Sequence, residues 1–302
     1  MYYFVYGLLY LLSLLPLRIL YILSDGLYLL IYYITGYRKK VVMDNLQTAF
    51  PEKNESERIK IAKQFYKNFI DSFIETIKLI SVSDSFLQKR FTIANLEILN
   101  ELQKTGKSCQ VHLGHTFNWE WGQLVLQKLI RYRLMIVYMP ISNKIFEKIF
   151  YKMRTRNGSI LLPATSMKSA MVHYKDTQYL LALVADQSPG NLNTSYWLNF
   201  FGKPTAFVSG PEKGAQRNEL PVVFAHIEKP RRGYYHAVIE LATADASKLS
   251  DAELTRKYVD YLEKVISQNP SMWLWSHRRW KHKWKAEYAA NWVDEKKPPA
   301  DC

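Results

Sequence analysis

One short segment of the sequence holds side chains that could do acid–base chemistry: His112, His115 and Glu120. The two histidines lie at the end of a predicted strand and in the turn after it, and Glu120 falls in the first turn of the helix expected next. Histidine titrates near neutral pH, so it can take the proton from a hydroxyl that attacks an acyl group. A carboxylate beside the ring would fix its tautomer and stabilise the imidazolium. The segment therefore predicts a general base, His115, held by Glu120.

The spacing of these two residues limits how they can meet. Five positions along a regular helix turn by about 140° in all, so the side chains would diverge if both lay on the helix. The pairing works only if His115 precedes the helix, as predicted here. A core histidine and a surface glutamate would give the same sequence, and spacing alone does not favour either interpretation.

Three other kinds of site could use the same stretch of chain. His112, His115 and Glu120 could hold a metal, but two histidines four residues apart around a glutamate are absent, and no cysteine cluster adds ligands. Cys109 could be a nucleophile, although a small buried strand residue is the commoner role for such a cysteine. A serine nucleophile would call for a Gly-x-Ser-x-Gly turn, which the sequence lacks. We therefore expect no metal site and prefer His115 as a base.

Alternating strands and helices are predicted to position these residues. From about residue 90, short apolar runs alternate with amphipathic ones, which predicts an α/β fold with a mostly parallel or mixed sheet covered by helices. In such sheets ligands gather beyond the carboxyl ends of the strands. The expected strands are 108–113, 134–138, 160–162, 179–185, 221–227 and 235–239, and the expected helices are 55–80, 119–130, 142–156, 166–174 and 252–267.

The N-terminus forms a separate predicted unit. Residues 1–17 carry no charged side chain, and apolar runs continue to Ile34 around Arg18 and Asp25. A membrane-spanning helix needs roughly 20 apolar residues, so this stretch could cross the membrane or lie in it as a shallow hairpin; a buried core helix is the alternative. Three basic residues, 38–40, follow directly, and such residues favour the cytoplasmic side. We therefore predict a membrane anchor at residues 1–37 and a cytoplasmic domain at 38–302.

The composition of the whole chain favours a membrane surface. Its 41 Lys and Arg against 27 Asp and Glu leave a formal charge of +14, and 14% of residues are aromatic. Basic proteins bind anionic partners such as nucleic acid, anionic lipid or acidic proteins, and Tyr and Trp favour membrane interfaces. With the apolar N-terminus, lipid is the preferred partner and nucleic acid is not expected. Two cysteines, Cys109 and Cys302, are too few for a disulfide framework.

Several motifs in a fixed order place these features in a family. The block from His115 to Glu120 resembles the histidine–four residues–acid motif of the lysophospholipid (glycerolipid) acyltransferase superfamily. The whole set resembles the late (secondary) acyltransferases of lipid A biosynthesis and their relatives that acylate mannolipids. The other motifs are Asn45-Leu46 with Phe50-Pro51, Arg154-Thr155-Arg156-Asn157-Gly158, Ala185-Asp186-Gln187-Ser188-Pro189, Phe200-Phe201-Gly202-Lys203-Pro204 and Trp275-Ser276-His277-Arg278-Arg279-Trp280.

The resemblance implies a reaction and its partners. The reaction is transfer of an acyl chain from a thioester, on acyl carrier protein or coenzyme A, to a hydroxyl of a lipid A precursor at the inner membrane. No metal or cofactor is needed. The implied fold is a mixed β-sheet flanked by helices, an acyltransferase-like sandwich with an N-terminal membrane helix. Two alternatives stay open: the same chemistry on a lyso-phospholipid, mannolipid or aminolipid, and a non-catalytic basic protein of the membrane surface.

The resemblance also assigns roles to residues. Beside His115 and Glu120, we expect Arg156 as a cation on the substrate side and Asp186 as the group that orients it or a substrate hydroxyl. The expected substrate-binding residues are Arg154, Lys203, Arg217, His277, Arg278 and Arg279.

Overall fold

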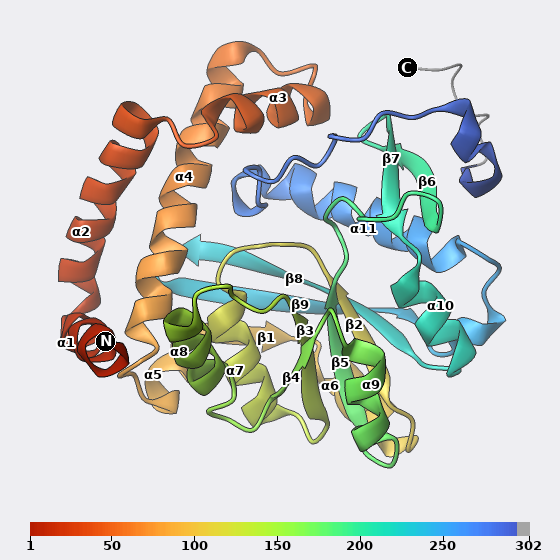
Figure 1. Ribbon diagram of the computed structural model, residues 1–302, viewed down its shortest axis with the longest axis horizontal. Coiled ribbons are helices and arrows are strands. Elements are labelled where there is room, and N and C mark those ends of the chain that lie inside the picture. Colours follow the sequence, from red (N-terminus) through yellow and green to blue (C-terminus); the bar gives the residue numbers. More distant parts are fainter. Residues whose placement is uncertain (295–302) are drawn as a thin grey trace.

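The computed structural model describes residues 1–294, apart from the side chain of Lys168, and it is built around a seven-stranded mixed sheet flanked by helices (Figure 1). All neighbouring strands are parallel except β8 and β9, which are antiparallel. The predicted fold class is therefore confirmed. Across the sheet the order is β1 (Phe91–Ala94), β9 (Tyr234–Thr243), β8 (Val222–Arg231), β2 (Cys109–Leu113), β5 (Tyr179–Val184), β3 (Arg133–Tyr138) and β4 (Ile160–Pro163).

Most predicted helices are present. The longest, α4 (Glu55–Lys78), begins at a capping box in which Asn54 and Glu57 satisfy each other's backbone N–H groups. The predicted helix 166–174 is shorter, because its last turn is a 3-10 turn. The other expected helices are α7 (Trp119–Leu129), α8 (Lys144–Arg154), α9 (Met167–Met171) and α11 (Glu253–Gln268), and those not predicted are α5 (Asp84–Gln88), α6 (Leu96–Lys104) and α10 (Gly210–Arg217).

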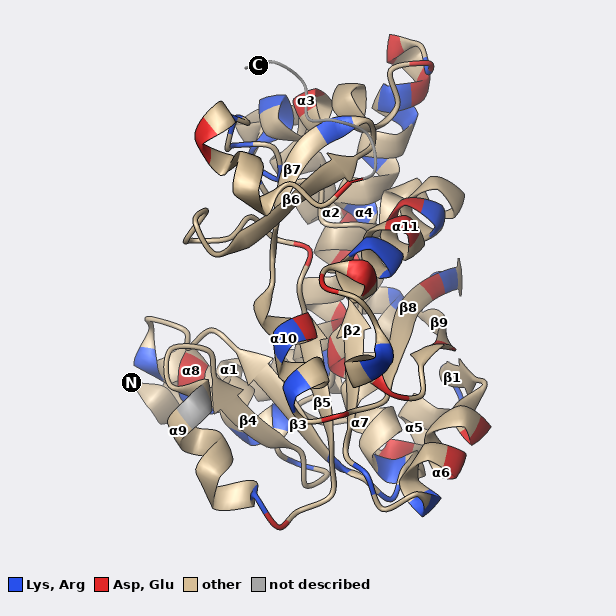
Figure 2. Ribbon diagram, turned by 90° about the vertical axis from the view of Figure 1, so that its right-hand side faces the viewer, with Lys and Arg blue, Asp and Glu red and all other residues tan. Residues whose placement is uncertain are grey.

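A separate hairpin, β6 (Ser195–Phe200) and β7 (Lys203–Val208), was also not predicted. Its two-residue turn is Phe201-Gly202, and both residues have positive φ, 51° and 69°. Hairpin turns of this kind need left-handed backbone, which explains the glycine in the Phe-Phe-Gly-x-Pro motif. The hairpin lies at the same end of the molecule as α3 (Lys39–Ala49) (Figure 2).

The N-terminal residues form two helices that pack on the rest of the fold. Pro16 separates α1 (Tyr2–Leu14) from α2 (Leu17–Leu29), which continues as a π-helical turn, Leu30–Thr35. Leu17–Thr35 is the one helix in the described chain that is long and apolar enough to cross a membrane. It lies beside α4 (Figure 1), with Leu20 and Tyr32 buried. Its other face is apolar and exposed, including Ile22 at 71% and Ile34 at 77%.

One large core joins the N-terminal helices to the sheet. It contains Leu20 of α2, Phe65 of α4, Trp121 of α7, Phe224 of β8 and Val259 of α11, all at least 95% buried. Burial of such side chains stabilises a fold by about 1.5–3 kcal/mol each. The sheet and its flanking helices therefore share one core with the apolar N-terminus.

Lysines and arginines are scattered among acidic residues over the side of the molecule seen in Figure 2. They do not gather into one continuous face there.

Candidate active site

His115 and Asp186 meet because their strands are parallel neighbours. In the register of β2 and β5, Leu113 lies beside Val184, so the residues two positions later emerge together at the carboxyl edge of the sheet. The Nδ1 atom of His115 lies 2.5 Å from Oδ1 of Asp186, and the backbone N–H of His115 donates to Oδ2 at 2.7 Å. The carboxylate therefore holds both the ring and the backbone of His115.

Asp186 is buried and fully engaged. Its Oδ2 atom also accepts a hydrogen bond from Nε1 of Trp273 at 2.6 Å. A Cβ atom at residue 114 would lie 3.3 Å from this oxygen and 2.7 Å from Cδ2 of Leu262, so any larger residue there would have to displace the Leu262 side chain. The carboxylate is thus fixed by hydrogen bonds from two distant parts of the chain, His115 and Trp273.

The two partners shift each other's titration. Burial alone would raise the pKa of Asp186, but the charge and hydrogen bonds of His115 lower it to about 2. Burial would lower the pKa of His115, but Asp186 raises it above its usual value. Asp186 is therefore ionised at neutral pH and keeps a proton on Nδ1, which leaves Nε2 as the basic atom of the ring.

Nε2 of His115 has its own neighbour, Gln187. The side-chain nitrogen of Gln187 lies 3.1 Å from this atom. The contact was not foreseen from the sequence, although Gln187 directly follows the predicted Asp186.

Glu120 does not pair with His115 as expected. It is the second residue of α7, and its carboxylate faces α8, where it accepts hydrogen bonds from Nε and Nη2 of Arg154 at 3.1 and 2.7 Å. Both side chains are buried, and the Arg154 guanidinium also lies over the Trp119 ring, 4.5 Å from its centroid. The start of α7 carries Glu120 away from the end of β2, so the expected partner is replaced by Asp186.

Arg156 also lies away from His115. Its guanidinium donates to the backbone oxygens of Leu79 and Val82, at 2.8 and 3.2 Å, and lies near Asp84. It therefore caps the C-terminal end of α4, and Asp186 contacts His115 instead of Arg156. The alternative, that Asp186 orients a substrate hydroxyl, stays a prediction. Arg154, two residues earlier, faces inward because it lies on the buried side of α8.

The expected substrate-binding cations of the C-terminal motif have varied surroundings. Arg279 is buried, donates to the backbone oxygen of Ala206 at 2.8 Å and packs on the Phe207 ring. Burial lowers its pKa to about 10. The ring nitrogen Nε2 of His277 accepts from the backbone N–H of Ser188 at 3.1 Å. Three other cations of the expected set are exposed: Lys203, Arg217 and Arg278.

These contacts explain two motifs that lie far apart in sequence. The side-chain amide of Asn45 donates to the backbone oxygens of Trp275 and His277, at 2.8 and 2.7 Å. Through this bond, the Asn-Leu segment of α3 holds the Trp-x-His-Arg-Arg segment. His277 in turn binds the loop that carries Asp186 and Gln187. Both motifs therefore help to hold this loop in position.

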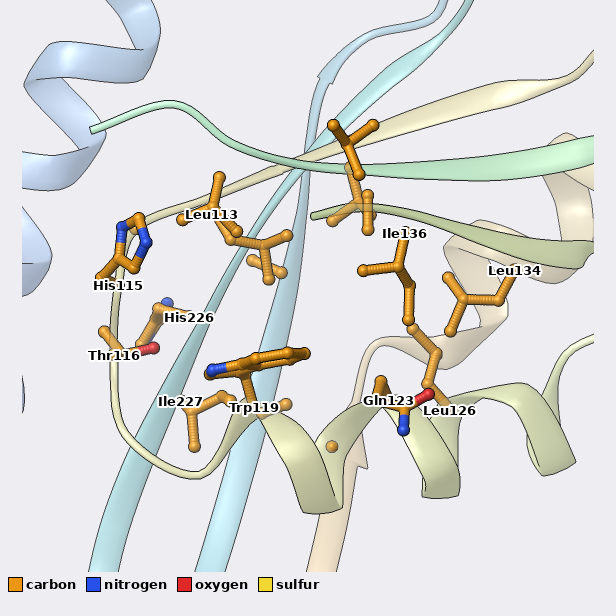
Figure 3. Close-up of a pocket in the computed structure, with 18 of the residues that line it drawn as sticks. Leu113, His115, Thr116, Trp119, Gln123, Leu126, Leu134, Ile136, His226 and Ile227 are labelled. Carbon is orange, nitrogen blue, oxygen red and sulfur yellow. The ribbon is translucent and has the colours of Figure 1, made fainter. Parts of the chain in front are cut away.

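A cavity of about 440 Å³ opens beside His115 and runs under the sheet. That volume is typical of pockets that take a small organic group. Figure 3 shows His115 and Thr116 at one end and Gln123, Leu126 and Leu134 at the other, with Trp119 between them. Most of its lining is apolar, and Arg154 and Gln187 are among the few polar lining residues. The cavity is therefore polar near His115 and mostly apolar elsewhere.

The alternative chemistries find little support among the described residues. No group of three or more His, Cys, Asp or Glu side chains in residues 1–294 could hold a metal ion. His112 is buried against the Gln110 amide, 2.8 Å away, and burial lowers its pKa to about 3. Cys109 is fully buried, and burial raises the pKa of its thiol to about 12, which makes it a poor nucleophile.

This fold and this site define an α/β protein in which a His–Asp pair faces a mostly apolar cavity. The family follows from comparison with known proteins: the model for "bacterial lipid A biosynthesis acyltransferase" matches residues 1–282. The chain belongs to this family and is an acyltransferase.

Individual relatives agree with this assignment at low identity. The lipid A biosynthesis lauroyltransferase of Escherichia coli K12 is 24% identical over 279 residues, covering 91% of this chain and 89% of its own length. The lipid A biosynthesis palmitoleoyltransferase of the same organism is 21% identical over 246 residues, covering 81% of this chain and 79% of its own. A lipid A biosynthesis acyltransferase of Haemophilus influenzae is 25% identical over 253 residues, with 81% and 78% covered.

Proposed function

We propose that this protein transfers a fatty acyl chain from a thioester to a hydroxyl of a lipid A precursor, with His115 as the general base. The observation that carries the proposal is the His115–Asp186 pair, with Nδ1 and Oδ1 2.5 Å apart at the mouth of the apolar cavity. The family and its relatives support the reaction class and the lipid.

The hydrogen bonds of the His115 ring determine the path of the proton. Nδ1–H donates to Asp186, so Nε2 takes the proton of the acceptor hydroxyl as its oxygen attacks the thioester carbonyl. The tetrahedral intermediate then collapses, the carbon–sulfur bond breaks, and the imidazolium returns its proton to the departing thiolate. Asp186 stabilises the imidazolium in between, because its charge lies against the ring.

The acyl chain occupies the cavity in this mechanism. Its carbonyl end lies at His115 and its tail points towards Leu126 and Leu134. Each methylene buried there stabilises binding by about 0.8 kcal/mol, so the depth of the cavity selects the chain length. Arg154, held by Glu120 in the cavity wall, is the proposed cation on the substrate side.

The proposed partners rest on the family and on the apolar N-terminus. The donor is an acyl thioester of acyl carrier protein or coenzyme A, and the acceptor lies in the inner membrane. The exposed apolar faces of α1 and α2 enter the lipid, while the domain stays on the cytoplasmic side, next to residues 38–40. No cofactor is needed for the chemistry of these residues.

The test uses the purified full-length protein in mixed micelles. Acyl thioesters of acyl carrier protein and of coenzyme A are supplied in turn, with a lipid A precursor, a lyso-phospholipid or a mannolipid as acceptor, and products are weighed by mass spectrometry. We expect transfer to the lipid A precursor, loss of at least a thousandfold in His115→Ala, and full activity after treatment with a chelator.

His173→Ala is the matched control, because His173 is an exposed histidine that does not line the cavity. It should retain wild-type activity. Substantial transfer by His115→Ala would remove the mechanism, and preference for another acceptor would change the substrate.

A further inference from the structure

We propose that the side-chain amide of Gln187 is a catalytic hydrogen-bond donor: it occupies Nε2 of His115 in the resting site and turns to the oxyanion during acyl transfer. The inference rests on the proposed function, and deepens it by naming the group that stabilises the tetrahedral intermediate.

The first step is the location of the protons. The carboxylate of Asp186 can only accept, so Nδ1 of His115, 2.5 Å away, carries a hydrogen and Nε2 carries a lone pair. The atom of Gln187 that lies 3.1 Å from Nε2 is the amide nitrogen, which must therefore donate. The base is thus capped by an amide N–H before substrate arrives.

The second step is that the Gln187 amide has a further hydrogen to donate. A glutamine nitrogen carries two hydrogens, and only one of them points at His115. Within residues 1–294 this contact is the one hydrogen bond of the Gln187 side chain, and the residue is only partly buried. A second donor is therefore free at the mouth of the cavity, which Gln187 helps to line.

The third step is that several neighbouring donors already have partners. The backbone N–H of His115 donates to Asp186, and that of Thr116 donates to the backbone oxygen of Gly114 at 2.8 Å. The backbone N–H of Ser188 donates to His277. Nε and Nη2 of Arg154 donate to the Glu120 carboxylate. Thr116 and Trp119, which also line the cavity, keep a neutral donor in the hydroxyl and the indole N–H, but among the described residues the Gln187 amide is the neutral side-chain donor that already contacts Nε2 of His115.

The reaction itself would move the amide. The acceptor hydroxyl must take the place of the amide at Nε2, because one lone pair accepts one donor along its axis. The displaced N–H groups would then be next to the reacting carbonyl group, whose oxygen gains the negative charge. The bond from the hydroxyl oxygen to the carbonyl carbon forms, the π electrons pass to the oxygen, and the amide donates to that oxygen until the thiolate leaves.

Two possible roles of this contact predict different changes in kcat when Gln187 is replaced. If Gln187 only blocks the base, its removal raises kcat or leaves it unchanged. If it donates to the oxyanion, its removal lowers kcat by about 10²–10³-fold, as for a single oxyanion donor elsewhere. KM for the thioester should change little, because the interaction belongs to the transition state.

The experiment measures kcat and KM of Gln187→Ala, Gln187→Glu and Thr116→Val in the acyl transfer assay. Gln187→Glu keeps the shape of the side chain but loses its N–H donors when ionised. We expect both Gln187 variants to lose about 100-fold or more in kcat, with KM within about threefold, and Thr116→Val to lose less than tenfold. Equal circular dichroism spectra and thermal midpoints establish that the variants are folded.

The outcomes separate this inference from the proposed function. Wild-type transfer that is lost in His115→Ala supports the function, whatever the Gln187 variants do. If that holds while Gln187→Ala stays within threefold of wild type, or exceeds it, the inference is overturned and the function stands. A large loss in Thr116→Val alone would assign the donor to Thr116 and overturn it also. Absence of transfer by the wild-type protein would overturn both.

Discussion

His115 and Asp186 are 71 residues apart in the chain, and two hydrogen bonds of 2.5 and 2.7 Å join them. One bond reaches the ring and the other the backbone, so the carboxylate fixes the imidazole in position as well as in tautomer. The predicted partner, Glu120, instead neutralises Arg154 in the cavity wall. The consequences for activity and stability differ for the two carboxylates and can be measured separately.

Asp186→Asn should lower kcat by about 10³–10⁴-fold, since a triad histidine that loses its carboxylate adopts the wrong tautomer. The pKa of His115 should also fall, because the raising effect of Asp186 is lost while burial remains. The rising limb of the pH–rate profile should therefore move to lower pH. The measurement is kcat against pH for both proteins, and an unmoved limb with wild-type kcat would contradict the role of Asp186.

Glu120→Ala should chiefly affect stability. It leaves the Arg154 guanidinium buried without its counter-charge, which costs about 3–5 kcal/mol. Urea unfolding measures this loss. The double variant Glu120→Ala with Arg154→Met should recover part of it, because the unpaired charge is gone. A double variant that is no more stable than Glu120→Ala would show that the charge is not the cause.

Glu75 should make stability depend on pH. This α4 carboxylate is fully buried and accepts from Tyr21, Asn118 and Tyr235 at 2.6, 2.6 and 2.5 Å. Burial raises its pKa from 4.5 to about 7, so the native state holds a proton that the unfolded state releases. Its stabilising contribution is complete below the unfolded value and is lost as pH rises through 7. The loss is about 3 kcal/mol at 1.4 kcal/mol per pKa unit.

Glu75→Gln is the test of that dependence, because glutamine cannot ionise. The difference in unfolding free energy between wild type and variant, measured by urea at pH 5 to 8, should change in favour of the variant as pH rises. Taking the difference removes the contributions of other groups. A difference that stays constant across this range would contradict a raised pKa.

The apolar face of α2 should bind lipid. Ile22 and Ile34 are 71% and 77% exposed, and burial of such a side chain stabilises by about 1.5–3 kcal/mol. Ile22→Glu with Ile34→Glu should therefore reduce binding to phospholipid vesicles at least tenfold in a sedimentation assay, without loss of thermal stability. Leu241→Glu, a change of a half-exposed leucine on β9, is the control and should bind as wild type. Equal binding by the wild type and both variants would mean that another surface of the protein binds the membrane.

The sequence by itself determined most of the elements and the family, and it singled out His115 as the candidate base. Apolar periodicity is local, so α4, α7 and β2 could be predicted within a few residues, and the order of the motifs indicated a lipid A acyltransferase. The hairpin of β6 and β7 was missed because neither strand has a clear alternation of apolar and polar residues.

Only the tertiary structure decided which groups meet. The chain leaves β2, builds β3 and β4, and then returns to insert β5 beside β2, and no local pattern encodes that order. The insertion places Asp186 beside His115, while Glu120 binds Arg154 instead. Pair contacts in a sheet depend on strand order and register, which are set by burial of the whole core, whereas the helices and strands themselves depend on residues close in sequence.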